Sequence, residues 1–371
     1  AVVKYHETEL LRKIMTDGMD VMGGAGICLG PRNRIARGYI GAPIGITVEG
    51  ANILTRTLII YGQGAIRCHP YAQREIQALQ AGDGRALLRA LAGHAFFALG
   101  NLARATVLSL TRGRLADAPV SGPTARYYRK LAWASASFAW LSDLAMITLG
   151  ARLKRKGKIT GRFADALSWM YIALATLRRY EAEGRRDEDL PLVQWATEHS
   201  LAQVQAAFDG IFANFEAPVV GALLRGPVAL WSRLNRVGSP PSDRLGAQVA
   251  RLLTRPGAAR ERLTAGIFLP ADPSEPMARL ERAFRLAVEA TPVLEKIRQA
   301  ERSGALPKGS PESQLEPALA AGIIDAREAG LVREAAAARL EAIQVDSFSE
   351  AEYLRRGAPD RAEEREPVGT H

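Results

Sequence analysis

The sequence predicts an all-α protein. Apolar residues recur with the period of an α-helix through most of the 371 residues, and Ala, Leu, Arg and Glu, which favour helices, are abundant. Alternating runs of β-branched residues, which would indicate strands, are almost absent. With 47% hydrophobic and 24% charged residues, the composition is that of a globular chain and excludes a fully disordered one.

The first 70 residues contain two predicted helices separated by a long connection. A helical pattern over residues 4–21 ends at a pair of glycines, Gly23 and Gly24. Residues 23–50 are rich in Gly and Pro without a clear period, so we expect a long structured loop, a kind of segment that is often functional. A second helix over residues 51–66 stops before His69 and Pro70.

Long helices separated by short turns predict a bundle in the middle of the chain. Shorter helical segments follow after residue 218, separated by linkers that contain Pro and Gly. The charged, apolar-poor residues 357–371 are expected to be disordered. The expected bundle helices are residues 84–111, 124–153, 162–183 and 190–215, and the later ones are residues 243–254, 275–301, 311–321 and 326–343.

Charge and cysteine content narrow the classes of partner. The formal net charge of +10 favours an anionic partner. The two cysteines exclude a disulfide scaffold, and the five histidines and two cysteines have no metal-site spacing, so we expect no metal. Nucleic acid is a poor interpretation, because aromatic residues are not interleaved with the cations and no binding motif occurs.

Two apolar stretches raise the question of a membrane. Residues 131–151 approach the length of a transmembrane helix, but Asp143 at the centre would cost about 3 kcal/mol, so we expect a buried bundle helix and no transmembrane span. Residues 218–238 combine Leu and Trp with only basic charges, which fits a membrane-surface segment and equally fits a packed core. The densest cation cluster could meet phosphates or could simply complement a helix end: Arg152, Lys154, Arg155, Lys156, Lys158 and Arg162.

Two short motifs carry the chemistry. Gly23 and Gly24 after a helix would let backbone N–H groups approach a phosphate or a flat ring, although such a pair is also a common helix end. Glu49 is a single carboxylate among apolar neighbours at the start of a helix, where it could also be a favourable N-terminal acid.

Taken together, these motifs resemble the C-terminal domain of acyl-coenzyme A dehydrogenases. The resemblance rests on three strings: MDVMGGAGI from Met19, TVEGANILTR from Thr47 and IYGQGAIRCHPY from Ile60. The last string, with RYY from Arg126 and DLPLV from Asp189, is similar to the large bacterial long-chain enzymes of fatty-acid β-oxidation. The resemblance implies residues 1–80 as a helical remnant of the dehydrogenase C-terminal domain and residues 81–356 as a second helical bundle domain. Because Ala1 enters a helix in mid-course, we expect an upstream part to be missing.

The resemblance implies a reaction and a set of site residues. FAD-dependent members oxidise an acyl-CoA to a trans-2-enoyl-CoA, and their Glu-Gly motif matches Glu49 and Gly50, making Glu49 the implied catalytic base. An apolar, dry setting around Glu49 would suit the removal of a weakly acidic α-proton. Implied FAD contacts are Gly23, Gly24, Asp20 and Asn52, and implied substrate contacts are Gly50 and Arg56. Asp20 departs from the family's usual Gln, and Ala51 from its usual Thr.

The resemblance also implies partners and a location. We expect an acyl-CoA substrate, a homodimer and an electron-transfer flavoprotein or similar acceptor, in the cytoplasm or peripherally on the inner face of the cell membrane. The fragment by itself is expected to be inactive. The alternative is a non-catalytic helical module for dimerisation or membrane docking, in which Glu49 only caps a helix.

Overall fold

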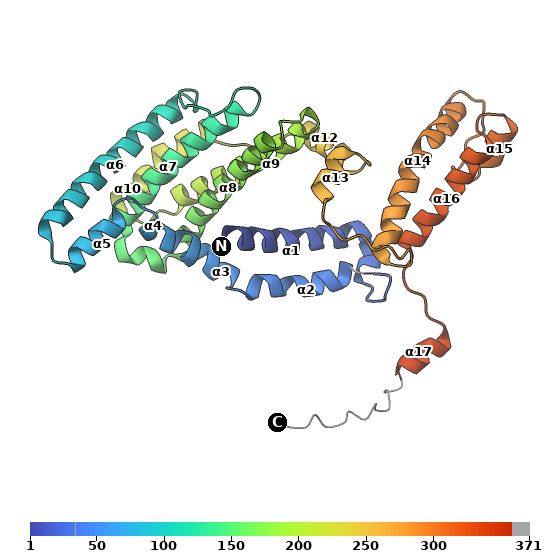
Figure 1. Ribbon diagram of the computed structural model, residues 1–371, viewed down its shortest axis with the longest axis horizontal. Helices are drawn as coiled ribbons and strands as arrows, with labels where there is room; N and C mark the ends of the chain where they lie inside the picture. The colour runs from blue at the N-terminus through green and yellow to red at the C-terminus, as the bar shows by residue number, and fades with distance from the viewer. Residues whose placement is uncertain (34, 358–371) are drawn as a thin grey trace. The chain divides into compact units, whose positions relative to one another are not determined.

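The computed structural model describes residues 1–33 and 35–357, and every regular element within these residues is helical. The all-α prediction is therefore confirmed (Figure 1). The chain divides into two compact units. Unit 1 comprises Ala1–Leu10 and Ile44–Ala265, and unit 2 comprises Leu11–Pro43 and Gly266–His371. The predicted division into domains near residue 80 stays a prediction.

Unit 1 holds the predicted bundle and the shorter helices that follow it. Helices α1 (Val2–Met22) and α2 (Ile35–Thr47) each cross from one unit into the other. The remaining helices of unit 1 are α3 (Asn52–Leu54), η2 (Thr55–Gln63), α4 (Gly64–Arg67), α5 (Ala72–Gln80), α6 (Gly84–Leu110), α7 (Ala125–Leu149), η3 (Gly150–Arg155), α8 (Gly157–Ala182), η4 (Asp187–Asp189), α9 (Leu190–Ala213), α10 (Pro218–Leu223), η5 (Leu224–Val228), α11 (Ala229–Leu234), α12 (Asp243–Leu253) and α13 (Ala258–Thr264).

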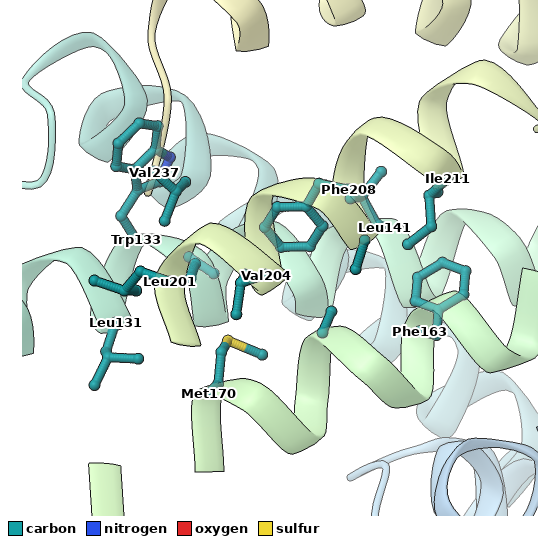
Figure 2. Packing of buried hydrophobic residues seen from close by; sticks show 14 of the residues in the cluster. Leu131, Trp133, Leu141, Phe163, Met170, Leu201, Val204, Phe208, Ile211 and Val237 are labelled. Carbon is teal, nitrogen blue, oxygen red and sulfur yellow. The ribbon is translucent and has the colours of Figure 1, made fainter. Parts of the chain in front are cut away.

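The core of unit 1 lies between α7, α8 and α9. Figure 2 shows Leu141 of α7, Phe163 of α8 and Phe208 of α9 directed into the same apolar interior. Trp133 of α7 is also buried. Each such side chain contributes roughly 1.5–3 kcal/mol through burial, so the core keeps α7 in the protein interior.

The helix that follows Glu49 packs on this core through Ile60 and Tyr61, which are both buried. Tyr61 of η2 is buried and stacks on Phe163, with ring centroids 4.5 Å apart and planes 8° from parallel. Burial raises the pKa of the Tyr61 phenol above its ordinary value, so the hydroxyl stays neutral. The predicted helix over residues 51–66 is confirmed as α3, η2 and α4, with wider π-type turns over Thr55–Gln63.

The stability of unit 1 should depend on pH through His6 of α1. Its ring is buried, lies 4.6 Å from the Trp169 ring, and has no hydrogen-bond partner at Nε2 among the described residues. Burial lowers the pKa of His6 below the ordinary value of about 6.5, so the unfolded chain binds more protons than the folded one. Stability should fall as the pH drops below about 6.5. His199, also beside Trp169, has a pKa lowered by burial and adds to this trend.

Urea unfolding at pH 7 and at pH 5 checks this prediction. We expect a lower urea midpoint at pH 5, and a smaller difference between the two midpoints in His6→Phe. Equal differences in wild type and variant would contradict a titrating His6, because Phe removes the only protonation site at that position.

Unit 2 has its own small core. Its helices after residue 266 are α14 (Pro276–Arg302), α15 (Leu315–Ala320), α16 (Ala326–Ile343) and α17 (Glu350–Gly357). Val293 and Ile297 of α14 belong to one buried cluster with Val332 of α16. Asp325 begins α16 with a capping box, in which the Glu328 backbone N–H donates to Asp325 Oδ1 at 2.7 Å. The three predicted helices of this region are confirmed.

The predicted loop over residues 23–50 is wrong for much of its length. A short 3₁₀ helix, η1 (Gly23–Ile27), opens the segment, and α2 occupies Ile35–Thr47. The glycines that weaken the helical pattern lie where α2 approaches α1. A Cβ at Gly38 would lie 2.7 Å from Met15 Sδ, and one at Gly45 would lie 3.3 Å from Thr8. These glycines permit close helix packing, although they reduce intrinsic helix propensity.

Other differences concern short or terminal segments. Helices α5 and α13 were not predicted, because 9 and 7 residues are too few to show a clear period. Gly357 ends α17, and the remaining residues of the predicted disordered tail, 358–371, lie outside the described residues.

By length and composition, two described helices could cross a membrane: α6 and the stretch Ala125–Arg155 that contains α7 and η3. The two differ in their surroundings. On α7, Asp143 and its neighbours Leu141 and Ala145 are buried, as expected for a bundle helix. On α6, most of the apolar window is exposed.

Candidate functional site

The turn between α2 and α3 has an unusual backbone. Glu49 has φ of 56°, in the left-handed region that a non-glycine residue rarely adopts, and Gly50 follows with φ of 88°. A left-handed residue with a side chain costs about 1–2 kcal/mol, so neighbouring contacts must hold it. Arg112 and Arg185, near the ends of α6 and α8, have a similar backbone conformation, so a role for the Glu49 turn rests on the contacts that hold it.

Side chains of α1 and α3 hold this turn. Lys4 Nζ of α1 donates to the Gly50 carbonyl at 2.8 Å and to Asn52 Oδ1 at 2.6 Å. Asn52, which is buried, donates from Nδ2 to Thr8 Oγ1 and to Glu9 Oε1, both at 2.9 Å. The amide of Asn52 is therefore satisfied by α1 and fixes the start of α3 beside it. Its predicted contact with FAD stays a prediction.

The Glu49 carboxylate lies at the surface of unit 1. Glu49 and Gly50 are exposed, and the side chains of Val48 and Ile53 are 47% and 76% exposed. Among the described residues, these neighbours therefore do not enclose the Glu49 carboxylate, and the expected dry site stays a prediction. A carboxylate on an open turn can accept a proton, but a dry site needs apolar groups supplied by another surface.

Arg56 is engaged inside unit 1. Its Nε donates to Asp165 Oδ1 of α8 at 2.7 Å, and a second guanidinium nitrogen contacts the other carboxylate oxygen. Asp165 also accepts from the Tyr5 hydroxyl at 3.5 Å, and burial followed by this carboxylate raises the pKa of Tyr5 to about 12. Because Asp165 binds the guanidinium at two atoms, a substrate would compete with it. The predicted substrate role of Arg56 stays a prediction.

The glycine turn lies in unit 2 and presents its backbone openly. Gly23 has φ of 57°, and a Cβ at Gly23 or Gly24 would meet nothing within 4 Å. The buried Asn33 holds the turn by donating from Nδ2 to the Gly26 carbonyl at 3.2 Å. Such an open backbone fits the close approach of a phosphate or flat ring. The exposed Asp20 does not favour an anion there.

A further cluster, not expected from the sequence, brings four titratable side chains together in unit 1. His69 Nε2 lies 2.9 Å from Asp143 Oδ1, and His94 Nε2 lies 3.5 Å from the same oxygen. On its other side, His94 Nδ1 lies 2.7 Å from Glu75 Oε1. The four residues follow α4 or lie on α5, α6 and α7, so this histidine–carboxylate cluster joins four successive elements.

Hydrogen-bond geometry assigns the proton positions in this cluster. His69 Nδ1 accepts from the backbone N–H groups of Tyr71 and Ala72, at 3.2 and 3.0 Å. The His69 proton must therefore be on Nε2, which donates to Asp143. His94 Nδ1–H donates to Glu75 for the same reason, since a carboxylate only accepts.

This assignment bears on the expectation of no metal. His69, His94 and Asp143 each offer one ligand atom, all within 4.8 Å of one another. His94 fits a metal ligand, because its second nitrogen donates to Glu75. His69 does not fit, because a ligand at Nε2 would require the proton to move to Nδ1, which faces two backbone donors. The geometry favours a hydrogen-bonded cluster over a metal centre.

The predicted site residues thus fall into two groups. Glu49, Gly50 and Asn52 form one turn in unit 1, and Arg56 lies one turn later with its side chain bound to Asp165. Asp20, Gly23 and Gly24 lie in unit 2.

Comparison with known proteins identifies the larger part of the chain. No solved structure matches the chain. The family model described as acyl-CoA dehydrogenase, C-terminal, bacterial type, matches residues 66–348. This range includes the histidine–carboxylate cluster and begins after the Glu49 turn. Because the match covers more than half of the 371 residues, the chain belongs to the bacterial-type acyl-CoA dehydrogenase C-terminal family.

Proposed function

We propose that this chain is the helical C-terminal part of an FAD-dependent acyl-CoA dehydrogenase that oxidises long-chain acyl-CoA in fatty-acid β-oxidation. The observation that carries the proposal is the held, left-handed Glu49 turn, just before a region that matches the dehydrogenase family. Glu49 removes the proton from the α-carbon of the acyl thioester. A hydride leaves the β-carbon at the same time, and the product is a trans-2-enoyl-CoA.

FAD, when bound, supplies the acceptor for this hydride. Gly23 and Gly24 are the residues that would approach its adenosine-diphosphate portion, since their backbone is open and a side chain is lacking. Asp20 requires a nearby cation to neutralise it if the pyrophosphate lies beside it. An electron-transfer flavoprotein or a similar acceptor would be the partner that reoxidises the bound cofactor.

The exposure of Glu49 supports one further part of the proposal. A base that removes an α-proton needs water to be excluded, and Glu49, Val48 and Ile53 are all exposed in unit 1. We propose that polypeptide outside the described residues covers this turn and completes the acyl-CoA and flavin sites. The direct test is acyl-CoA oxidation by the complete enzyme with and without the Glu49 carboxylate. Turnover that depends on this carboxylate is the expected result.

A second candidate function, docking on a membrane surface, is favoured by the outer face of α6. Along this face Leu88, Phe96, Leu99 and Leu110 are 70%, 77%, 61% and 65% exposed. The opposite face of α6 packs inward, with Ala90, His94, Asn101, Ala105 and Leu108 buried. Helix α6 is therefore apolar on both faces but packs against the protein on only one, so the other face forms an exposed apolar stripe.

The predicted membrane-surface segment 218–238 extends this stripe. Trp231 Nε1 of α11 donates to Ser109 Oγ of α6 at 2.7 Å, which fixes α11 beside the end of α6. Leu223, Leu230 and Leu234 are exposed there, while Leu224 and Ala229 are buried. Residues 218–238 thus pack on one side and are apolar and exposed on the other. The exposed side supports the proposal of membrane docking.

Charge favours an anionic bilayer as the cover. No Asp or Glu occurs from Gly84 to Ala116 or from Ala217 to Ser242, whereas arginines occur throughout both segments. An interfacial helix with exposed Leu and Phe and only basic charges suits anionic lipid headgroups. A second copy of the chain would place these like charges opposite one another.

Co-sedimentation with vesicles tests this docking. We expect binding to vesicles that contain about one third phosphatidylglycerol and a loss of at least tenfold in Phe96→Glu/Leu99→Glu, because two charges on the stripe oppose burial in the interface. Phe268→Glu, on a Phe side chain that is 83% exposed in unit 2, is the matched control and should bind normally. Membrane docking would be contradicted if the double variant bound vesicles as well as wild type does. It would also be contradicted if the double variant lost self-association and not vesicle binding.

A further inference from the structure

We propose that unit 1 binds a single-chain amphiphile with an anionic headgroup. The site is a cavity between α5, α6 and η3, three elements within the residues that match the family model. The cavity has a volume of about 610 Å³, which is within the usual range for small-molecule sites. Its walls come from α4, α5, α6, α7 and η3 and are mainly apolar, including Ile66, Ile76, Leu91, Met146 and Ile147. An apolar chain is the occupant that such walls suit best.

Only a few polar side chains line this cavity, and most of them are already engaged. Glu75 and His94 bind each other at 2.7 Å within the histidine–carboxylate cluster. The buried Thr160 donates to backbone carbonyl groups of its own helix. Lys154 is different, because it lines the cavity, is exposed, and has no ion pair within the part of the chain that the structure describes.

The cations near Lys154 indicate that the headgroup of the ligand is negatively charged. Arg152, Arg155 and Lys158 are exposed and likewise have no ion pair among the described residues. Lys156 is the member of this cluster that is paired, with Glu216. No Asp or Glu occurs from Leu144 to Ala164. The C-terminal dipole of α7 accounts for one or two cations in this place, but a run without any acid attracts a mobile anion.

Apolar walls beside an unpaired cation cluster define the ligand class. The apolar chain occupies the cavity, and the anionic head lies among Lys154 and its neighbours. A fatty-acid carboxylate and a lysophospholipid phosphate both have this chemistry. Binding requires no redox step, so its measurement does not depend on the proposed dehydrogenase reaction.

Displacement of a fluorescent 16-carbon fatty acid from the purified 371-residue chain tests the proposal. We expect competition by palmitate and by 1-palmitoyl lysophosphatidate, because both carry an anionic head on a 16-carbon chain. Competition by only one of the two would identify the carboxylate or the phosphate as the preferred head. The zwitterionic 1-palmitoyl lysophosphatidylcholine should compete at least tenfold less well, and inorganic phosphate should not compete. Shortening the fatty acid by two methylene groups should weaken its binding by roughly tenfold. Equal competition by the zwitterionic lipid would overturn the anionic headgroup.

Surface variants locate the site without disturbing the core. Leu91→Glu places a charge in the cavity wall at a half-exposed side chain, and Lys154→Glu reverses the lining cation. Each should weaken palmitate binding by at least tenfold. The matched controls are Leu99→Glu and Arg104→Glu, which lie on α6 outside the cavity and should bind as wild type does.

Three results would overturn the assignment: no saturable binding by wild type, normal binding by Leu91→Glu, or an equal loss in Leu99→Glu. The last result would place the amphiphile on the exposed stripe of α6 and not in the cavity. Urea midpoints for each variant ensure that a loss of binding reflects the site and not unfolding.

Discussion

In the complete enzyme, Glu49→Gln should lower kcat for palmitoyl-CoA by about 10²–10⁴-fold, the range for loss of a general base. Gln keeps the size and hydrogen-bonding ability of the side chain but cannot take the α-proton. The turn should remain intact, because Lys4 and Thr55 bind the Gly50 carbonyl and not the Glu49 side chain. Substrate binding, measured by KM, should therefore change far less than kcat.

Two companion variants sharpen this experiment. Glu7→Gln removes an exposed carboxylate from α1 and should leave turnover unchanged. Glu49→Asp keeps the carboxylate but withdraws it by one methylene, and a displacement of about 1 Å can cost on the order of 10²-fold in rate. If Glu49→Gln kept a third or more of the wild-type kcat, Glu49 would not be the base and the turn would be structural.

Asp143→Ala should lower the free energy of unfolding by about 1–3 kcal/mol, as expected when a buried donor is left without its acceptor. Asp143 is 1% exposed, and its Oδ1 accepts from His69 at 2.9 Å. Without it, the Nε2–H of His69 is buried beside His94 with no acceptor, and a space opens on α7. The urea midpoint measured at pH 7 should fall accordingly.

A control variant and a milder variant show whether the loss of stability in Asp143→Ala comes from the buried cluster. Asp117→Ala, at an exposed position, should change stability by no more than about 0.5 kcal/mol. Asp143→Asn keeps an acceptor for His69 but lacks the negative charge, so its cost should be intermediate. A loss in Asp143→Ala of less than about 1 kcal/mol would show that the cluster is not an important stabilising feature.

Most of the helices could be predicted from the sequence, because their apolar faces impose a period on the chain. The long helices of the bundle, including α7 with its buried Leu141 and Ala145, have such faces. Helix α2 could not be predicted from its residues. Gly38 and Gly45 are favourable only because α1 lies against them, and that proximity is a property of the folded chain.

The candidate site was predictable only where a motif is local. Glu49 and Gly50 are adjacent in the sequence, so the resemblance could identify them, but the exposure of Glu49 depends on what surrounds it. His69, His94 and Asp143 are far apart along the chain and form no recognisable spacing. One signal was available: a lone acid in an apolar helix must have a buried donor, and histidines are suitable partners for it.

The position of His69 has a consequence for how unit 1 opens. Its Nδ1 accepts from the backbone amides of Tyr71 and Ala72 at the start of α5, and its Nε2 donates to Asp143 in the second half of α7. The start of a nine-residue surface helix is thereby tied to the bundle interior through a single imidazole ring. These amides can exchange their hydrogens with solvent only when their hydrogen bonds to His69 break. The start of α5 should therefore exchange as slowly as the long bundle helices, and not as fast as the frayed end of a short surface helix.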